Sequence, residues 1–376
     1  YTLWHTLSLH DALPISHVAT HGPGWWGEPR LEQTCPRCRR RRPADVMTEI
    51  IRLIRDGMRS ASADAKLVAW TWRWIIHYAD PQEEVISGLP DDVLLMTNYE
   101  EGVPLERAGK EVRCEEYSLS VVGPGPLFEA HADLAARRGM GMLAKLQVSA
   151  SHELATTPNI PDIPSLYRKF CWMREHRLAG AMACWNFGCS RTLNTAAVRM
   201  LSEAEELPEE GEFLTALSEA YFGEGVDHPA VARAWAGFHE ALGHHPMNLD
   251  FLYFGPLNYA PAFPWPESPG TKQMARSWTD EPWGDRLEDS LSPYTLDEMI
   301  ELLGAMAEGW EAAMASYRPA LAPAAARPGP AREELGAAEY VGACVRSAHN
   351  GYGWHRCLRE GRKDGGLIEN ELALCR

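Results

Sequence analysis

Short apolar runs alternate with longer amphipathic segments along the first half of the chain. The apolar, β-prone runs, each typical of a buried strand, are residues 66–76, 92–100, 116–122, 141–149 and 178–187. The segments with apolar residues at helical spacing are residues 43–61, 127–138 and 164–177, and a short helix or connection is expected at 80–90. Strands that alternate with helices form parallel βαβ units. The pattern therefore predicts an α/β fold.

Each expected strand begins with apolar residues and ends with polar or aromatic ones. A TIM (β/α)8 barrel shows this asymmetry, because its active site is built at the carboxyl ends of the strands. The expected strands are fewer than the eight of a complete barrel. The predicted fold is therefore the C-terminal part of a TIM barrel followed by an α-helical domain. An open doubly wound sheet is the alternative, although no Gly-rich dinucleotide or phosphate fingerprint follows any strand.

The pattern changes after Gly188, where helical spacing and then long aromatic loops replace the strand–helix alternation. A strong amphipathic helix is expected over residues 295–315. The predicted organisation is a partial barrel at 17–190, a helical and aromatic-loop domain at 191–320, a Pro/Ala linker at 321–332, and a C-terminal helix and tail at 333–376.

Composition and charge narrow the functional classes. The chain of 376 residues has a formal net charge of -16 at pH 7, which argues against nucleic-acid and anionic-membrane partners because both require a positive surface. No apolar run approaches the roughly 20 residues that span a membrane. The 9 cysteines are odd in number and irregularly spaced, so no disulfide framework is implied. The sequence leaves the cellular compartment open.

Asn98, Tyr99, Glu100 and Glu101 end the strand expected at 92–100. A carboxylate there can act as an acid or base, as a nucleophile, or as an acceptor for a sugar hydroxyl. Glu100 is the preferred catalytic candidate, ahead of Glu101, and Asn98 is a candidate for substrate binding. Glycoside hydrolysis normally uses two carboxyl groups, and only one good position is visible. The alternative is a solvated strand-to-helix loop.

Tryptophan is abundant, with 14 residues in the chain, and two groups lie on expected strands. Trp70, Trp72 and Trp74 alternate along one strand, so they are expected to point to the same face. Trp70 and Trp72 can stack on a sugar ring there, and the alternative is packing between barrel and helices. Trp185 and Asn186 end the last strand, where they can contact a carbohydrate or cap the barrel.

Lys145, Gln147 and Ser149 also alternate along one expected strand. Polar side chains on one face of an otherwise apolar strand must be satisfied or face a cavity, and lysine is almost never buried without a partner. The three residues are therefore predicted to line a substrate pocket, where Lys145 binds a hydroxyl or a carboxylate. A Schiff-base role for Lys145 is a further alternative.

Two short segments carry side chains of the kinds that bind metal ions. Cys35 and Cys38 supply two thiols where structural zinc takes four ligands, and His21 is the only close extra candidate. His244 and His245 are adjacent, and adjacent side chains rarely chelate one ion. We therefore expect neither a metal nor a cofactor.

The order of several segments resembles a known family. The segments are TCPRC at residues 34–38, AWTW at 69–72, VLLMTNYE at 93–100 and CWNFG at 184–188. Their order is similar to that of bacterial glycosidase-like proteins of the barrel clan related to hexosaminidases and α-glucuronidases. The resemblance covers roughly residues 30–320 and implies a carbohydrate substrate and hydrolysis of a glycosidic bond. In such families the proton-donating carboxylate precedes the Cys-x-x-Cys loop, a place at or before residue 17 here, so no residue of this chain takes that role.

Residues 6–16, TLSLHDALPIS, resemble the translation of a common sequencing-adapter oligonucleotide that recurs at the ends of metagenomic reading frames. We therefore expect residues 1–16 to be non-native and further barrel strands to be missing upstream. A partial barrel exposes strand edges through which the chain can self-associate. The sequence supports two hypotheses: a glycoside hydrolase-like protein, incomplete as this fragment, and a non-catalytic carbohydrate-binding or scaffold barrel.

Overall fold

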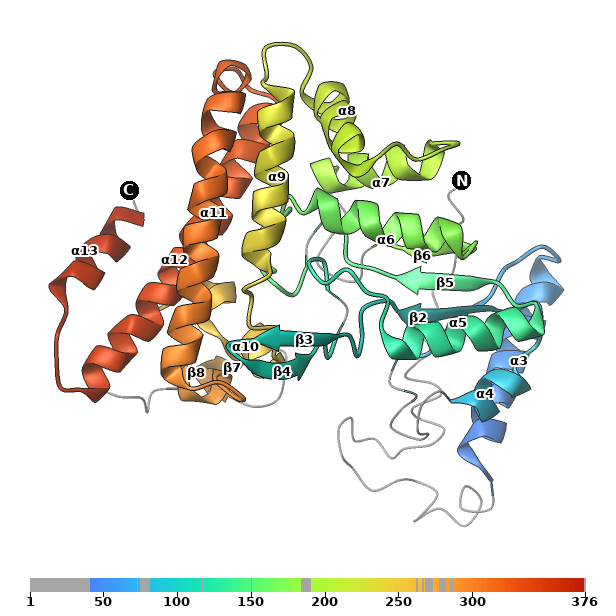
Figure 1. The fold of residues 1–376 in the computed structure, drawn as a ribbon. Helices are drawn as coiled ribbons and strands as arrows, with labels where there is room; N and C mark the ends of the chain where they lie inside the picture. Colours follow the sequence, from blue (N-terminus) through green and yellow to red (C-terminus); the bar gives the residue numbers. More distant parts are fainter. Residues whose placement is uncertain are drawn as a thin grey trace. The chain divides into compact units, whose positions relative to one another are not determined.

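The computed structural model describes residues 41–374 apart from 73, 75–81, 117, 150, 184–190, 262, 266, 268–272, 277–281 and 285–286. The described residues are mixed α/β, with a parallel sheet and a helical C-terminal region (Figure 1). They divide into two compact units. The sheet unit takes its residues from Tyr1–Glu101, Pro124–Lys145 and Met173–Met182, and the helical unit from Gly102–Gly123, Leu146–Trp172 and Ala183–Arg376.

Within the described residues, the sheet unit contains four parallel strands, and their order in the sheet is their order in the chain. They are β1 (Val68–Trp70), β2 (Leu94–Asn98), β5 (Met142–Lys145) and β6 (Gly180–Met182), paired as β1-β2-β5-β6 (Figure 1). The predicted strands at 66–76, 92–100, 141–149 and 178–187 are confirmed, each shorter than its apolar run. A closed barrel is not seen in the part of the chain that the structure describes.

Helices of the sheet unit begin and end where local chemistry favours it. Both α3 (Pro43–Ala61) and α5 (Pro126–Arg138) have proline in the first turn, where its missing N–H costs no helical hydrogen bond. Helix α5 ends at Gly139, which adopts a left-handed φ of 66° and donates its N–H to carbonyls of the last turn. The short helix expected at 80–90 is α4 (Glu83–Gly88), and α5 packs against β2 and β5.

The helical unit contains hairpins and the longest helices. The hairpins join β3 (Pro104–Arg107) to β4 (Lys110–Arg113) and β7 (Gln273–Arg276) to β8 (Pro282–Gly284). The α-helices are α7 (Leu193–Glu203), α8 (Glu210–Phe222), α9 (His228–Leu242), α10 (Leu249–Phe254), α11 (Leu296–Ala325), α12 (Pro330–Arg359) and α13 (Gly365–Leu374), with 3-10 turns η4 (Pro256–Tyr259) and η5 (Leu287–Ser290). Helix α6 (Ile163–Glu175) begins in this unit and ends in the sheet unit.

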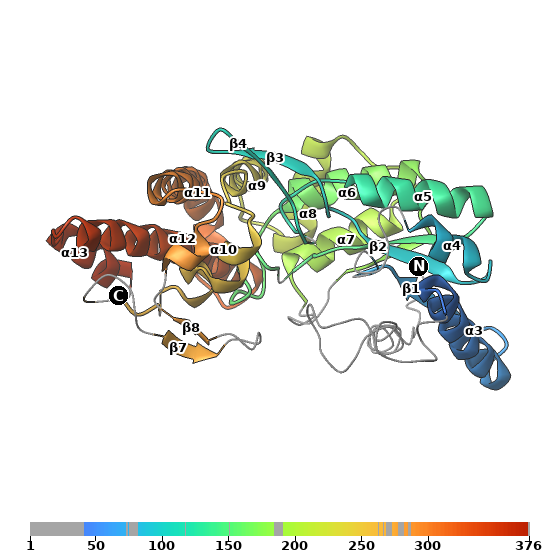
Figure 2. The same cartoon turned by 90° about the horizontal axis from the view of Figure 1, so that it is seen from below.

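Aromatic residues pack α9 against α11, which lies beside α12 (Figure 2). Phe238 of α9 stacks on Trp310 of α11 with ring centroids 4.2 Å apart. Trp310 Nε1 donates to the Ala338 carbonyl oxygen of α12 at 2.9 Å, so its buried polar atom is satisfied. A Cβ added to Gly342 of α12 would lie 2.9 Å from the Trp310 ring. The close approach of α12 to this indole therefore requires glycine.

The prediction of a strand at residues 116–122 is wrong. The described residues of 116–122 form no strand, because the backbone N–H groups of Leu119 and Ser120 donate to the Glu153 carboxylate, at 2.9 and 3.0 Å, instead of to a neighbouring strand. The hairpin of β3 and β4 precedes this segment and was not expected. Its strands read PLER and KEVR, and this charged sequence lacks the apolar alternation that reveals a strand.

The Pro/Ala segment expected as a linker is largely helical. Helix α11 continues through Pro319 and Pro323 to its end at Ala325, and α12 begins at Pro330. A proline inside a helix costs about 3 kcal/mol, so the packing of α11 against α9 and α12 must offset that cost. The boundary expected between residues 190 and 191 also differs from the observed units, which are not consecutive stretches of chain.

A substitution at Gly125 tests the close packing between the turn after β2 and the residue that precedes α5. A Cβ added to Gly125 would lie 1.9 Å from the Glu101 carbonyl oxygen, so Gly125→Ala must displace backbone. We expect this change to lower the free energy of unfolding by about 2 kcal/mol, measured by urea denaturation. The matched control is Gly57→Ala, on the exposed side of α3 with nothing within 4 Å of the added Cβ. Helix propensity should make the control more stable by about 0.5–1 kcal/mol, and equal effects would contradict the packing.

Candidate functional site

The register of the sheet places Trp70, Asn98 and Lys145 on one side. Asn98 pairs with Lys145 across β2 and β5, and residues paired in register on neighbouring strands point to the same side. Trp70 pairs with Met96, two residues before Asn98, so it shares that side. The three side chains lie at the carboxyl ends of three adjacent strands and are at most 1% exposed. This side of the sheet is called the site face below.

Helix α5 covers the opposite side of the sheet. Thr97 Oγ1 accepts from Thr71 Oγ1 at 3.0 Å and lies 2.8 Å from Nδ1 of His131, which α5 carries. Tyr99 packs edge-on against Phe128 of α5, with ring centroids 4.9 Å apart. Because odd and even residues of a strand point to opposite sides, the site face is turned away from α5.

A chain of hydrogen bonds leads from the site face to the turn after β2. Trp70 Nε1 donates to Asn98 Oδ1 at 3.0 Å, and Asn98 Nδ2 donates to Glu101 Oε2 at 2.8 Å. The expected alternation of Trp70, Trp72 and Trp74 is wrong, because β1 ends at Trp70. The Trp72 ring nevertheless stacks on Trp70 with centroids 5.4 Å apart. The structure thus brings Trp70, Trp72, Asn98 and Lys145 together and adds Glu101.

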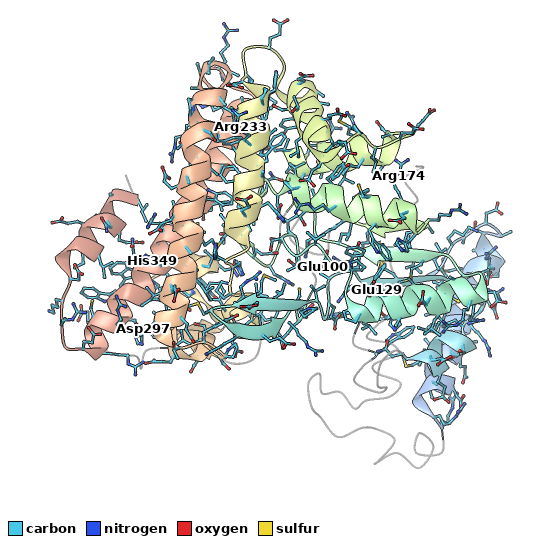
Figure 3. The ribbon with its side chains drawn as sticks, in the orientation of Figure 1. Glu100, Glu129, Arg174, Arg233, Asp297 and His349 are labelled. Atoms are coloured by element: carbon cyan, nitrogen blue, oxygen red, sulfur yellow. The ribbon has the colours of Figure 1, made fainter. Side chains whose placement is uncertain are left out.

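Glu100 lies just beyond the end of β2, close to the helix that carries Glu129 (Figure 3). Its side chain is completely buried, whereas Glu101 is half-buried. Burial, together with the charges of Glu100 and Glu129, raises the pKa of Tyr99 above its usual range. The two adjacent carboxylates thus have different environments, and the one that the sequence pattern prefers, Glu100, is the enclosed one.

Gln147 and Ser149 do not share a strand with Lys145, because β5 ends at Lys145 and both residues belong to the helical unit. The Ser149 hydroxyl lies 2.9 Å from the hydroxyl of Thr192, the N-cap of α7. Gln147 is 1% exposed, and its Nε2 has no hydrogen-bond partner among the residues that the structure describes. The predicted common face of these residues is therefore wrong. The remaining predicted contacts, Trp185 and Asn186, lie outside the described residues.

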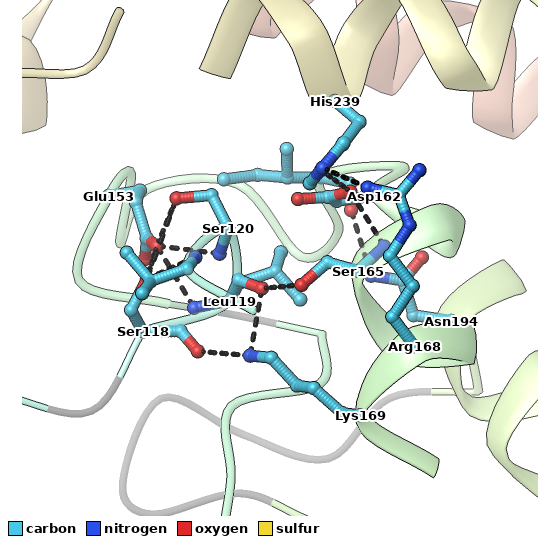
Figure 4. Close-up of polar contacts among 12 residues, drawn as sticks. Ser118, Leu119, Ser120, Glu153, Asp162, Ser165, Arg168, Lys169, Asn194 and His239 are labelled. Atoms are coloured by element: carbon cyan, nitrogen blue, oxygen red, sulfur yellow. Dashed lines mark hydrogen bonds and ion pairs between the residues drawn. The ribbon is translucent and has the colours of Figure 1, made fainter. Parts of the chain in front are cut away.

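A buried carboxylate, Glu153, organises the loop of the helical unit that contains Ser118 and Ser120 (Figure 4). Its Oε1 accepts from both serine hydroxyls and from the backbone N–H groups of Leu119 and Ser120. Burial opposes ionisation, but the electrostatic interaction with the His245 ring and these hydrogen bonds outweigh it and lower the pKa of Glu153 to about 2. The donors lie about 33 residues away in sequence, so no local motif revealed the cluster.

His245 is held as a neutral ring beside Glu153. Its Nδ1 accepts from the Met247 N–H at 3.1 Å, so the proton lies on Nε2, which faces the Glu153 carbonyl oxygen at 3.4 Å. Burial lowers the pKa of His245 to about 4, with a smaller opposing effect of Glu153. Both ring nitrogens of His245 thus face partners within the protein.

Two further buried charges order the loops near Glu153 (Figure 4). Lys169 of α6 donates to the carbonyl oxygens of Ser118 and Leu119 at 2.7 and 3.0 Å. Asp162 accepts from His239 Nδ1 at 2.9 Å, and its backbone precedes α6. Buried charges must be paired or hydrogen-bonded, and these partners fix the loops that replace the missing strand.

Glu334 of α12 is a second buried carboxyl group of the helical unit. Its Oε1 accepts from the Leu193 N–H at 3.1 Å and from the Tyr221 hydroxyl at 3.2 Å, and its Oε2 accepts from Asn159 Nδ2 at 3.1 Å. Desolvation outweighs these three donors and raises the pKa of Glu334 to about 7. The buried carboxyl group therefore favours the folded state most while it carries its proton, because the three donors do not offset the cost of burying its charge.

Comparisons with family models, curated proteins and solved structures find no match for this chain. Among the residues that the structure describes, no group of three or more His, Cys, Asp or Glu side chains is arranged to hold a metal ion. No helix in the same part of the chain is long and apolar enough to cross a membrane. The site therefore has to be interpreted from its own geometry.

Glu334 predicts a specific dependence of stability on pH. The folded state keeps a proton that the unfolded chain releases between pH 4.5 and about 7, so this group's contribution to stability falls as the pH rises through that window. We expect Glu334→Gln to remove the loss and to be more stable than the wild type at pH 8, by up to about 3 kcal/mol. The matched control is Glu333→Gln, at the exposed neighbouring position.

The measurement is urea denaturation of the three proteins at pH 5 and pH 8. The difference between wild type and Glu334→Gln isolates this carboxyl group from His245, whose lowered pKa acts in the opposite direction between pH 4 and 6.5. A difference that is the same at both pH values would show that Glu334 is ionised in the folded protein throughout.

Proposed function

We propose that this chain is the C-terminal part of a TIM-barrel, glycoside hydrolase-like protein whose site face binds a carbohydrate. The observation that carries the proposal is the gathering of Trp70, Asn98 and Lys145 at the carboxyl ends of adjacent parallel strands, on the side turned away from α5. In a TIM barrel the helices cover the outside, and the site is built at the carboxyl ends of the strands.

The strand order supports a barrel over a doubly wound sheet. A doubly wound sheet reverses its strand order at a switch point, where its ligand binds. The order β1-β2-β5-β6 follows the chain without a reversal in the described residues. Strands added in one direction close into a barrel when enough of them are present, and that is the architecture we propose.

The residue types on the site face suit a sugar. An indole offers a flat apolar surface for a sugar ring, and Trp72 is half-buried on Trp70. Asn98 and Lys145 line the same face with amide and ammonium groups; both are at most 1% exposed, so they orient the groups that surround a bound sugar. Hydrolysis also requires a carboxyl group that reaches the substrate, and the turn after β2 supplies the half-buried carboxylate of Glu101.

Carbohydrate binding without hydrolysis is the second candidate function. The observation that favours it is the complete burial of Glu100, the carboxylate that the sequence pattern prefers for catalysis. A binding protein needs the aromatic and polar groups of the site face but no carboxyl pair. The two functions differ in one readout, which is release of the aglycone from a chromogenic glycoside.

Trp72→Ala tests the site face directly. We expect the change to weaken binding of the best sugar from a panel of mono- and disaccharides about fivefold by isothermal titration calorimetry, since stacking contributes roughly 1 kcal/mol. Trp265→Ala is the matched control, because Trp265 stacks on Trp354 within the helical unit and should leave the affinity unchanged. Equal losses from the two changes, or no binding of any sugar by the wild type, would reject the proposed function.

A further inference from the structure

The turn after β2 presents two carboxylates in adjacent positions, and their surroundings differ. Glu100 is 0% exposed, so protein encloses its side chain completely. Glu101 is half-buried and lies three residues after Asn98, so the turn returns its side chain towards the end of the strand. A group that contacts substrate must be reachable from solvent, and this favours Glu101.

Asn98 orients one oxygen of the Glu101 carboxylate. An asparagine amide can rotate to exchange its oxygen and nitrogen, and a neighbouring group decides which end points where. Trp70 Nε1 can only donate, and it donates to Asn98 Oδ1 at 3.0 Å. The amide nitrogen is therefore directed at Glu101, whose Oε2 accepts from it at 2.8 Å.

The backbone of the same turn is also fixed. The N–H of Gly125 donates to the Tyr99 carbonyl oxygen at 2.7 Å, and a Cβ on Gly125 would overlap the Glu101 carbonyl oxygen. Tyr99 itself is anchored on Phe128 of α5. The main chain of Glu101 is thus positioned by Gly125, which precedes α5, and its side chain is positioned by Asn98.

We propose that Glu101, rather than Glu100, is the carboxylate of the site face that contacts the substrate, and that Asn98 and Trp70 are its positioning residues. The inference rests on the proposed carbohydrate-active function. Positioning through a side-chain amide is effective because Asn98 is 1% exposed and cannot exchange its partners for water. Trp70, at 1% exposed, is equally enclosed.

Among the residues that the structure describes, titratable groups around this turn come from the turn itself, β5 and α5. Glu100 lies beside Glu101 in the turn, Lys145 pairs with Asn98 from β5, and Glu129 lies on α5, where its charge and that of Glu100 act on Tyr99. A substitution at Asn98 that introduces a carboxylate adds one negative charge beside these titratable groups and leaves each of them in place. A shift in the pKa of Glu101 then shows whether residue 98 contacts its carboxylate.

The experiment compares Glu101→Gln with Glu100→Gln in the full chain, using hydrolysis of a panel of 4-methylumbelliferyl glycosides. We expect Glu101→Gln to lower kcat/KM at least about a hundredfold, the usual effect of losing a carboxyl group that acts on the substrate. Glu100→Gln should retain activity within about threefold wherever the variant is folded. Urea denaturation of each variant separates a loss of folding from a loss of function.

Asn98→Asp supplies the readout that a structural role would not change. The new carboxylate still accepts from Trp70 but repels Glu101, so it should raise the pKa of Glu101 and move the corresponding limb of the pH–rate profile upward by about one pH unit or more. Thr97→Val, on the α5 side of the same strand, is the matched control, because it removes buried hydrogen bonds and should lower stability without moving the profile.

The outcomes separate the inference from the function on which it rests. Loss of activity in Glu101→Gln with a shifted profile in Asn98→Asp supports the inference. Full activity in Glu101→Gln, or an unshifted profile in a folded Asn98→Asp, overturns it and leaves the proposed function in place. Absence of hydrolysis by the wild type across the panel overturns the inference, and binding of a sugar in that case favours the non-catalytic function.

Discussion

The arrangement of the sheet unit depends on the register in which β2 pairs with its neighbours. Pairing of Asn98 with Lys145 and of Met96 with Trp70 decides which side chains share a side of the sheet. A slip of one residue would exchange the two sides and direct Asn98 towards α5. The contacts of Thr97 with His131 and of Tyr99 with Phe128 oppose that slip, because both join β2 or its end to α5. The site face is thus defined by packing on the opposite face.

In the helical unit, buried charged side chains satisfy backbone hydrogen-bonding groups that strand pairing satisfies in the sheet unit. The segment around Leu119 has the composition of a strand, yet its backbone donors turn to Glu153 and its carbonyl oxygens accept from Lys169. An ionised carboxylate that accepts several hydrogen bonds can compete with a strand for backbone donors, because charge-assisted hydrogen bonds are the stronger ones. The cost of burying the charge is offset only when every member of the network is present.

The sequence predicted the part of this structure that apolar periodicity governs. The four strands were found because their centres are continuous apolar runs, but their ends were extended too far, since Gln147 and Ser149 continue the alternation where no neighbouring strand remains to pair. The helical course of residues 319–325 was missed because the local cost of Pro319 and Pro323 is visible in the sequence, whereas the packing of α11 that offsets it is not. For the candidate site, Trp70 and Lys145 were identifiable by alternation along expected strands, and Asn98 as a polar residue at the end of one. The hydrogen bond from Asn98 to Glu101 depends on the course of a turn, which the pattern of apolar and polar residues does not predict.

Three carboxylates show why surroundings, rather than sequence position, assign a role. Glu153 receives hydroxyl and backbone donors and a nearby histidine, so it stays ionised and holds a loop. Glu334 receives three donors, but its burial dominates, so it keeps its proton close to neutral pH and joins segments to α12. Both are enclosed, and their hydrogen bonds point inward to the protein. Glu101 combines partial exposure with a directed donor from a buried amide, which is the arrangement that a group needs when it must be both oriented by the protein and accessible to a substrate.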